Sequence, residues 1–179
     1  MGVSGVGKTT IGQLLARRLD CEFLDADDFH PPANVAKMAA GTPLEDADRW
    51  PWLDRLNALL RERAARSASA VLACSALKQS YRERLCRDVA RCRLVYLHAD
   101  ACVLRARLAA RTHRYMPASL LDSQLATLEP PGGAIAVDAA APPEHCAEMI
   151  AAALTRPEGW VKAAGRACAP YSARNARAR

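Results

Sequence analysis

The sequence predicts an α/β domain of three layers, in which a parallel sheet is flanked by helices. Short apolar runs of strand length alternate with helical patterns from residue 9 to residue 155, and this alternation is typical of parallel strands covered on both faces. Residues 2–9 read Gly-Val-Ser-Gly-Val-Gly-Lys-Thr, which matches the phosphate-binding pattern that joins a buried strand to a helix. Both observations indicate the same fold class.

The stretch from Gly2 to Thr9 is predicted to bind the phosphates of a nucleotide. Its glycines let backbone N–H groups turn toward phosphate oxygens, Lys8 supplies a cation for the β- and γ-phosphates, and the Thr9 hydroxyl is a ligand for Mg²⁺. A helix expected from Thr9 to Leu19 would hold the phosphates at its positive N-terminal end. The predicted contacts are Gly2, Val3, Ser4, Gly5, Val6, Gly7, Lys8 and Thr9.

The strand that should precede this loop is missing, because only Met1 stands before Gly2. A central parallel strand would bury four or five aliphatic side chains at roughly 1.5–3 kcal/mol each. This is most of the roughly 5–15 kcal/mol of net stability of a domain. We therefore expect the true start of the protein to lie upstream, and Met1 to be an internal methionine.

The first half of the chain continues with one strand and two helices. Residues 21–25 form a short strand that ends in an acidic cluster. A helix is expected over 33–40, because proline is tolerated in a first turn and a glycine and a proline follow it. A longer helix begins near Asp46 and ends near Arg66, with Pro51 as a first-turn residue or a kink.

The second half repeats the alternation of strand and helix. Residues 70–74 and 92–97 are nearly continuous apolar runs, as expected for strands covered on both faces. Asp100 is the expected N-cap of the helix that follows the second of them. The remaining expected elements are helices over 81–89, 100–110, 118–128 and 144–154 and a strand over 134–137.

The charge of the chain is concentrated at its C-terminal end. The net charge is +6, and residues 156–179 hold six basic residues against Glu158 alone. We therefore divide the chain into one domain over 1–155 and a basic tail over 156–179, which we expect to be disordered because it has little apolar surface to bury. A solvated tail is preferred to a nucleic-acid contact.

Composition also indicates a cytoplasmic protein without a membrane partner. The sequence contains no run of about 18 apolar residues and no basic-then-apolar leader. Its seven cysteines are odd in number and show no Cys-x-x-Cys spacing. We expect reduced thiols in preference to metal ligands or a disulfide framework.

Two acidic residues after the first strand are candidates for phosphoryl-transfer chemistry. Transfer of a γ-phosphoryl group needs a carboxylate that holds Mg²⁺ and a group that orients or deprotonates the acceptor hydroxyl. Asp25 and Asp27 lie two residues apart, so both would point to one side of an extended chain. The alternative is a solvated acidic turn.

A group of arginines is a candidate for the cations that the transfer also needs. Arg107, Arg111 and Arg114 recur at spacings of four and three, just where the helical pattern breaks. We expect a short lid at about 111–118 that closes over ATP and excludes water, with Arg107 as an ATP contact and Arg111 as a catalytic residue. The alternative is a solvated helix face.

Three further segments of the chain read DADDFHPPANVAKMAAGTPLEDADRWPWL, ACSALKQSYRERL and MPASLLDSQLATLEPP. These segments resemble the gluconokinases, small kinases with a phosphate loop that phosphorylate D-gluconate on its 6-hydroxyl with ATP. The resemblance implies the P-loop kinase fold, related to that of shikimate kinases, with ATP and Mg²⁺ as cofactors and a homodimeric assembly. It spans roughly residues 2–150.

The same resemblance assigns roles to individual residues. It implies phosphate or Mg²⁺ contacts at Lys8, Thr9 and Thr10, with Lys8 also catalytic. It implies that Asp27 is the base or binds the acceptor hydroxyl. From the residues themselves, Thr9 and Asp25 are the expected ligands of the metal. The residues implied to hold the polyol and its carboxylate are His30, Lys37, Arg49, Lys78 and Arg82.

Some of these assignments have alternatives. Lys37 is as well explained by a solvated helix face, and His30 by a helix cap. The lid has Thr112 before His113 where many gluconokinases have a glycine, which weakens His113 as a contact. At the level of function, the alternatives are a kinase of another small hydroxy acid such as shikimate, or an inactive truncated nucleotide-binding paralogue.

Overall fold

The computed structural model describes residues 1–110 and 118–155. The predicted lid lies outside the described residues except for Ala118, and so do Arg111 and the basic tail over 156–179. The helices and strands are α1 (Lys8–Arg18), β1 (Glu22–Asp25), the 3₁₀ helix η1 (Ala26–Phe29), α2 (Pro32–Ala39), α3 (Asp46–Ala65), β2 (Ala70–Ala73), α4 (Gln79–Cys86), β3 (Val95–His98), α5 (Ala101–Ala109), α6 (Ala118–Thr127), β4 (Ile135–Asp138) and α7 (Pro143–Leu154).

The strands form two parallel pairs among the described residues. In the first pair, β1 lies beside β2 with Phe23 opposite Val71. In the second pair, β3 lies beside β4 with Tyr96 opposite Ala136. The parallel alternation predicted from the sequence is confirmed, and η1 is an element that the sequence patterns did not predict.

Met1 and Gly2 lie between the two pairs of strands. The amine of Met1 donates to the carbonyl of Val95 at 2.6 Å, and its carbonyl accepts from the N–H of Leu97 at 2.9 Å. On the other side, the N–H of Gly2 donates to the carbonyl of Ser75, which follows β2, at 3.2 Å. Met1 therefore forms one rung of a parallel ladder with β3, and Gly2 reaches the loop after β2.

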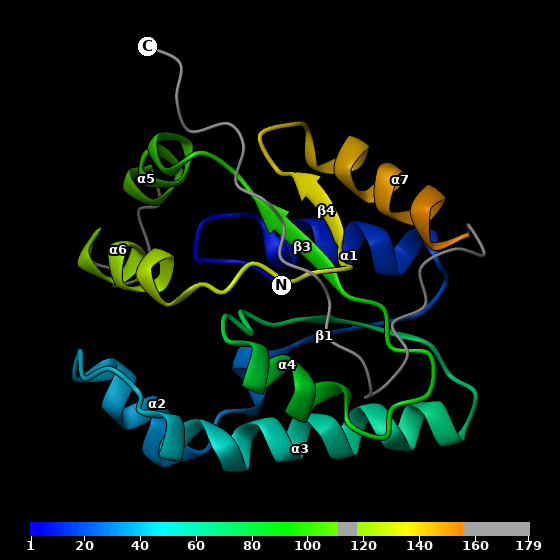
Figure 1. Cartoon of the computed structure of the whole chain (residues 1–179), viewed down its shortest axis with the longest axis horizontal. Helices are drawn as coiled ribbons and strands as arrows, with labels where there is room; N and C mark the ends of the chain where they lie inside the picture. Colours follow the sequence, from blue (N-terminus) through cyan, green and yellow to red (C-terminus); the bar gives the residue numbers. More distant parts are fainter. Residues whose placement is uncertain (111–117, 156–179) are drawn as a thin grey trace.

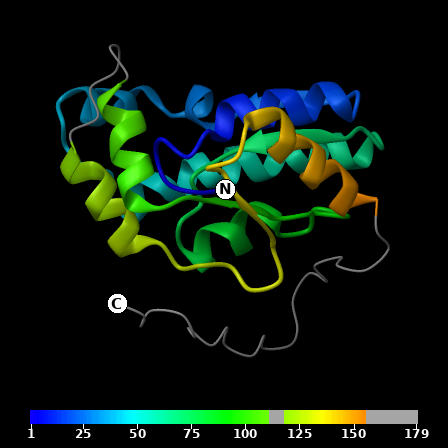
Figure 2. The same cartoon turned by 90° about the horizontal axis from the view of Figure 1, so that it is seen from above.

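Helices cover the strands on both sides, which gives the three layers. On one side α1 and α7 pack together, and their buried Ile11, Leu15 and Ile150 belong to one hydrophobic core. On the other side α3 and α4 form a second core with Leu53 and Leu56 (Figure 1). A view from above shows α5 and α6 side by side at one end of the molecule (Figure 2).

Local chemistry explains where the functional helices begin. Gly7 is the N-cap of α1 with φ of 96°, a left-handed conformation that glycine adopts without strain. At the start of α3, Glu45 and Asp48 form a reciprocal capping box. Pro51 lies inside α3. Asp100 is the N-cap of α5, as predicted, but its side chain makes no capping hydrogen bond.

Two cysteines are paired, which corrects the expectation that all seven are reduced thiols. Cys86 at the end of α4 and Cys92 ahead of β3 form a disulfide, with Cα atoms 6.1 Å apart. The connection folds back through left-handed turns at Asp88 and Arg91, which brings two cysteines together at a spacing that a search for Cys-x-x-Cys misses. The described free cysteines are Cys21, Cys74, Cys102 and Cys146.

A search of the described residues for a membrane-crossing helix finds none with the required length and apolar character.

Candidate active site

The phosphate loop runs from Gly2 into the first turn of α1. Val3 and Val6 are buried beneath it, and the Nζ of Lys8 donates to the carbonyl of Val3 at 3.1 Å. The N–H of Ser4 donates to Oε1 of Gln124, on α6, at 2.6 Å. The loop is thus anchored by apolar side chains below it and contacted by a polar side chain from α6.

Oxygen ligands suitable for Mg²⁺ meet at the start of α1. The hydroxyl of Thr9 donates to Oδ2 of Asp25 at 2.9 Å, and Oδ1 of Asp25 accepts from the N–H of Asp27 at 3.2 Å. The described residues contain no cluster of three or more His, Cys, Asp or Glu side chains that could hold a metal. A hydroxyl and a carboxylate nevertheless fit Mg²⁺, which is usually bound through one or two carboxylates together with phosphates and water.

The relation between Asp25 and Asp27 differs from the predicted one. An extended chain would point both side chains to the same side, but β1 ends at Asp25 and Asp27 lies in η1. The indole N–H of Trp52 donates to the carbonyl of Ala26 at 2.8 Å and fixes this turn. The backbone of Asp27 is therefore held against the Asp25 carboxylate by a capping interaction, not by strand geometry.

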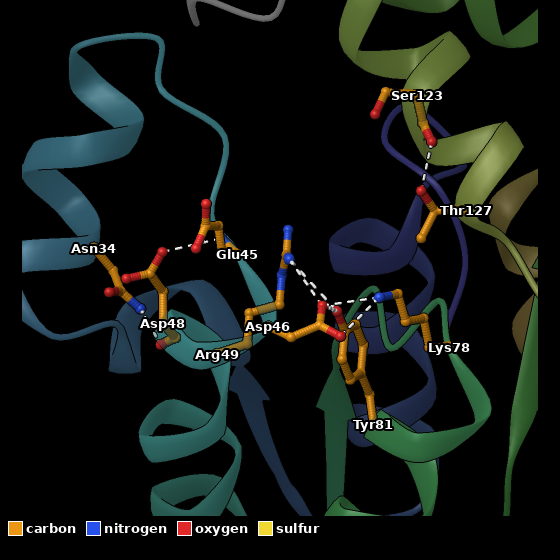
Figure 3. Close-up of polar contacts among 9 residues, drawn as sticks. All are labelled: Asn34, Glu45, Asp46, Asp48, Arg49, Lys78, Tyr81, Ser123 and Thr127. Atoms are coloured by element: carbon orange, nitrogen blue, oxygen red, sulfur yellow. Dashed lines mark hydrogen bonds and ion pairs between the residues drawn. The ribbon is translucent and has the colours of Figure 1, made fainter.

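A cluster of charged and aromatic side chains lies where α3 and α4 begin (Figure 3). The Nζ of Lys78 is 2.8 Å from each carboxylate oxygen of Asp46, and the Tyr81 hydroxyl donates to Oδ1 of Asp46 at 2.5 Å. A guanidinium nitrogen of Arg49 is 3.9 Å from Oδ1 of Asp46 and donates to the Tyr81 hydroxyl at 3.5 Å. We call Asp46, Arg49, Lys78 and Tyr81 the acceptor cluster.

The acceptor cluster is electrostatically suited to an anion. Hydrogen bonds from Lys78 and then Tyr81 hold the pKa of Asp46 below its usual value, and the bond to Asp46 raises the pKa of Lys78. Lys78 and Arg49 thus place two cationic side chains against a single carboxylate. The two cations approach Asp46 from different directions, which leaves a partly exposed cluster of net positive charge.

His30 lies near charged groups of both parts of the candidate site, Asp27 and Arg49. Its ring stacks on Trp52 with centroids 4.1 Å apart, and its Nδ1 is 3.4 Å from the amide nitrogen of Asn34. Burial lowers the pKa of His30, while the nearby charge of Asp27 raises it and that of Arg49 lowers it. The N-cap of α2 is Pro31, so His30 is not the cap of that helix.

Comparison with known proteins decides the family. The model of a family described as an AAA domain matches residues 1–131. A gluconokinase from Gluconobacter oxydans is 53% identical over 132 residues, which cover 74% of this chain and 74% of that protein. The chain belongs to the gluconokinase family. The resemblance predicted from the three segments is thereby confirmed.

Two solved kinase structures have the same fold. A gluconokinase from Sinorhizobium meliloti superimposes with a TM-score of 0.75 at 43% identity, covering 86% of this chain and 88% of that chain. A sugar kinase from a Janibacter species gives a TM-score of 0.78 at 44% identity, covering 87% and 90%. The P-loop kinase fold is thus confirmed, and this gluconokinase-family chain is a kinase that uses ATP.

Three other predicted site residues have protein partners of their own. Arg82 is buried, and it donates to the carbonyls of Ala76 and Leu77 at 3.0 and 2.8 Å. Burial lowers the pKa of Arg82. Lys37 forms an ion pair with Asp48 at 2.6 Å, and Arg107 donates to the carbonyl of Ala139 at 2.8 Å. The acceptor cluster therefore includes Arg49 and Lys78 but neither Arg82 nor Lys37.

Three residues of the candidate site were not predicted from the sequence. Asp46 and Tyr81 lie inside the segments that carry the resemblance, but their roles depend on contacts across 32 and 35 residues of chain. Gln124 contacts the loop across 120 residues. The spacing of residues along the sequence does not predict such long-range contacts, so only the resemblance of the segments could have indicated them.

Proposed function

We propose that the chain transfers the γ-phosphoryl group of ATP to D-gluconate and forms 6-phospho-D-gluconate. The observation that carries the proposal is the acceptor cluster, because it combines two cations with a carboxylate and a phenol in a chain 53% identical to a gluconokinase. A sugar acid has a carboxylate at one end and hydroxyls along its length. The cluster offers ion-pair partners for the first and hydrogen-bonding groups for the second.

The carboxylate of gluconate is assigned to Lys78 and Arg49. Asp46 holds Lys78 and Arg49 in place before the substrate arrives, which lowers the entropy cost of binding. Arg82 acts on this site through the backbone, because its hydrogen bonds to the carbonyls of Ala76 and Leu77 hold the segment that leads to Lys78. We propose it as a positioning residue instead of a direct contact.

The acceptor cluster is linked directly to the phosphate loop. The segment over 75–78 joins β2 to α4, and its Ser75 carbonyl accepts from the N–H of Gly2 at 3.2 Å. The Lys78 end of the same segment binds Asp46. One short segment thus touches both the nucleotide site and the acceptor site, which supports a transfer between them.

In the proposed reaction, the 6-hydroxyl oxygen attacks the γ-phosphorus, and the bond between that phosphorus and the oxygen bridging to the β-phosphate breaks. Asp27 accepts the hydroxyl proton, and His30 orients the polyol beside it. Lys8 and the N–H groups of the loop stabilise charge on the phosphate oxygens. Arg107 and Thr10 are further proposed ATP contacts, and Arg111 is a proposed catalytic cation outside the described residues.

Thr9 and Asp25 are the proposed ligands of Mg²⁺. The ion would supply charge neutralisation on the β- and γ-phosphate oxygens. The homodimer, the cytoplasmic location, the lid and the disordered tail remain predictions.

The test is acceptor-dependent release of ADP by the full chain. We expect turnover with D-gluconate, little with shikimate and only background without an acceptor. ³¹P NMR of the product should show a phosphate monoester on the 6-carbon. Turnover with shikimate but not gluconate would transfer the proposal to the other hydroxy acid. ATP binding without any acceptor-dependent turnover would refute the kinase assignment in favour of an inactive nucleotide-binding paralogue.

A further inference from the structure

Glu129, which follows α6, contacts the backbone on both sides of Lys78. Its N–H donates to the carbonyl of Leu77 at 3.0 Å, and its Oε2 accepts from the N–H of Gln79 at 2.5 Å. Leu77 and Gln79 are the residues immediately before and after Lys78. One residue, 50 positions from Gln79 in the sequence, therefore holds the backbone of Lys78 at two points.

The bond to Gln79 caps α4 from outside the helix. The first N–H groups of a helix have no partner within it, and the helix dipole favours a negative charge beside them. Lys78 occupies the N-cap position of α4, and its side chain makes no capping hydrogen bond, because an ammonium has no acceptor. The carboxylate of Glu129 supplies the acceptor instead. A lysine can thus stand at this helix start and direct its ammonium toward Asp46.

Arg82 and Glu129 bind the same backbone carbonyl. The carbonyl of Leu77 accepts from the guanidinium of Arg82 at 2.8 Å as well as from the N–H of Glu129, and its two lone pairs allow both bonds. Burial lowers the pKa of Arg82, and the charge of Glu129 opposes this shift. The peptide that joins Leu77 to Lys78 is therefore fixed both from α4 and from the segment after α6.

The backbone of Glu129 is held in place by its neighbours in the chain. Thr127 ends α6, and its hydroxyl donates to the carbonyl of Ser123 at 2.8 Å (Figure 3). Leu128 packs against both hydrophobic cores. Pro130 follows Glu129 and restricts its backbone to extended conformations. The carboxylate is exposed, but the chain that carries it is anchored to the interior.

We propose that Glu129 is a positioning residue, which fixes the backbone of Lys78 so that its ammonium meets the carboxylate of the sugar acid. Glu129 acts through Lys78 and does not itself touch the substrate. The inference rests on the proposed function, in which Lys78 binds that carboxylate. It adds a residue that the proposed reaction does not use, although Glu129 lies in the third segment that resembles the gluconokinases.

The experiment measures steady-state kinetics of the full chain with Glu129→Ala. Loss of a helix cap should raise the KM for D-gluconate by about 2- to 30-fold, whereas the KM for ATP and kcat change little. Glu129→Gln keeps an oxygen that can accept from the N–H of Gln79, so it should restore most of the parental KM. The matched control is Glu83→Ala, because Glu83 accepts from the side-chain amide of the same Gln79 at 2.7 Å. It should leave the KM unchanged.

A double-mutant cycle separates positioning of Lys78 from a general structural effect. If Glu129 acts through Lys78, adding Glu129→Ala to Lys78→Met should raise the KM for gluconate no further. Additive effects would overturn the proposal, as would equal increases in the KM for ATP and for gluconate. A raised KM in Lys78→Met with a parental KM in Glu129→Ala would refute the role of Glu129 alone. A parental KM in Lys78→Met would refute the assignment of the carboxylate, and the role of Glu129 with it.

Discussion

Replacement of Lys78 by methionine tests the acceptor cluster most directly. The substitution keeps a long apolar side chain but removes the ammonium that lies 2.8 Å from both oxygens of Asp46. A hydrogen bond to a charged group contributes about 1.5–3 kcal/mol, which corresponds to a loss of about 10- to 150-fold in gluconate affinity. The ion pair itself is partly exposed, so its loss should cost the fold only about 0–1 kcal/mol.

The assay compares two ligands that differ only at the end where gluconate carries its carboxylate. D-Glucitol has the hydroxyl chain of gluconate but carries CH₂OH in place of the carboxylate. Isothermal titration of the parent chain and of Lys78→Met with both ligands forms a thermodynamic cycle. We expect the preference for gluconate over glucitol to fall by about 10-fold or more, whereas glucitol binding itself changes little.

Lys37→Met is the matched control, because it makes the same change at a lysine of α2 that pairs with Asp48 and not with Asp46. It should leave the preference unchanged. A natively folded Lys78→Met chain that kept the full preference for gluconate would refute the assignment of the carboxylate to Lys78.

Three further outcomes are expected. Asp27→Asn should lower kcat by at least about 10²-fold while ATP binding survives, and near-parental turnover would remove Asp27 from the catalytic role. The free energy of unfolding should rise from pH 5 to pH 8, because the folded pKa of the Met1 amine is lowered from 8.0 to about 5 and the unfolded chain therefore binds more protons in this range. The increase in unfolding free energy that the Met1 amine contributes is at most about 4 kcal/mol. N-terminal acetylation should remove the contribution of Met1 and leave that of His30, whose pKa is also lowered. An identical pH dependence of the unfolding free energy after acetylation would contradict the reasoning. Leu53→Ala, at a fully buried position, should cost about 2–5 kcal/mol in a denaturant titration, against a small effect for the exposed Leu19→Ala.

The sequence predicted the elements whose residues carry the local pattern. Ile11 and Leu15 recur at helical spacing and are buried in α1, and the apolar run over 70–74 became β2. Bounds shifted by up to several residues where no local signal marked them. The strand expected over 92–97, for instance, is β3 from Val95 to His98.

The structure differed from the prediction where contacts with residues distant in the sequence determine the local conformation. The turn of η1 depends on Trp52, whose indole binds the Ala26 carbonyl from 26 residues away. Arginine is usually exposed at the protein surface. Arg82 is nevertheless buried, because its guanidinium donates hydrogen bonds to the backbone carbonyls of Ala76 and Leu77. The pairing of Cys86 with Cys92 depends on a reversal of the chain. None of these partners can be read from spacing along the sequence.

The contact between Gln124 and the phosphate loop affects how much binding affinity a nucleotide can gain from the N–H of Ser4. The N–H of Ser4 already has a carbonyl acceptor at 2.6 Å, so a phosphate oxygen arriving there would exchange one acceptor for another. Such an exchange preserves the loop's shape when no nucleotide is bound, and it limits the affinity gained from that N–H. It also makes α6 a direct reporter of the loop, since an isotope label on the Gln124 side-chain amide would register the arrival of phosphate without touching the catalytic residues.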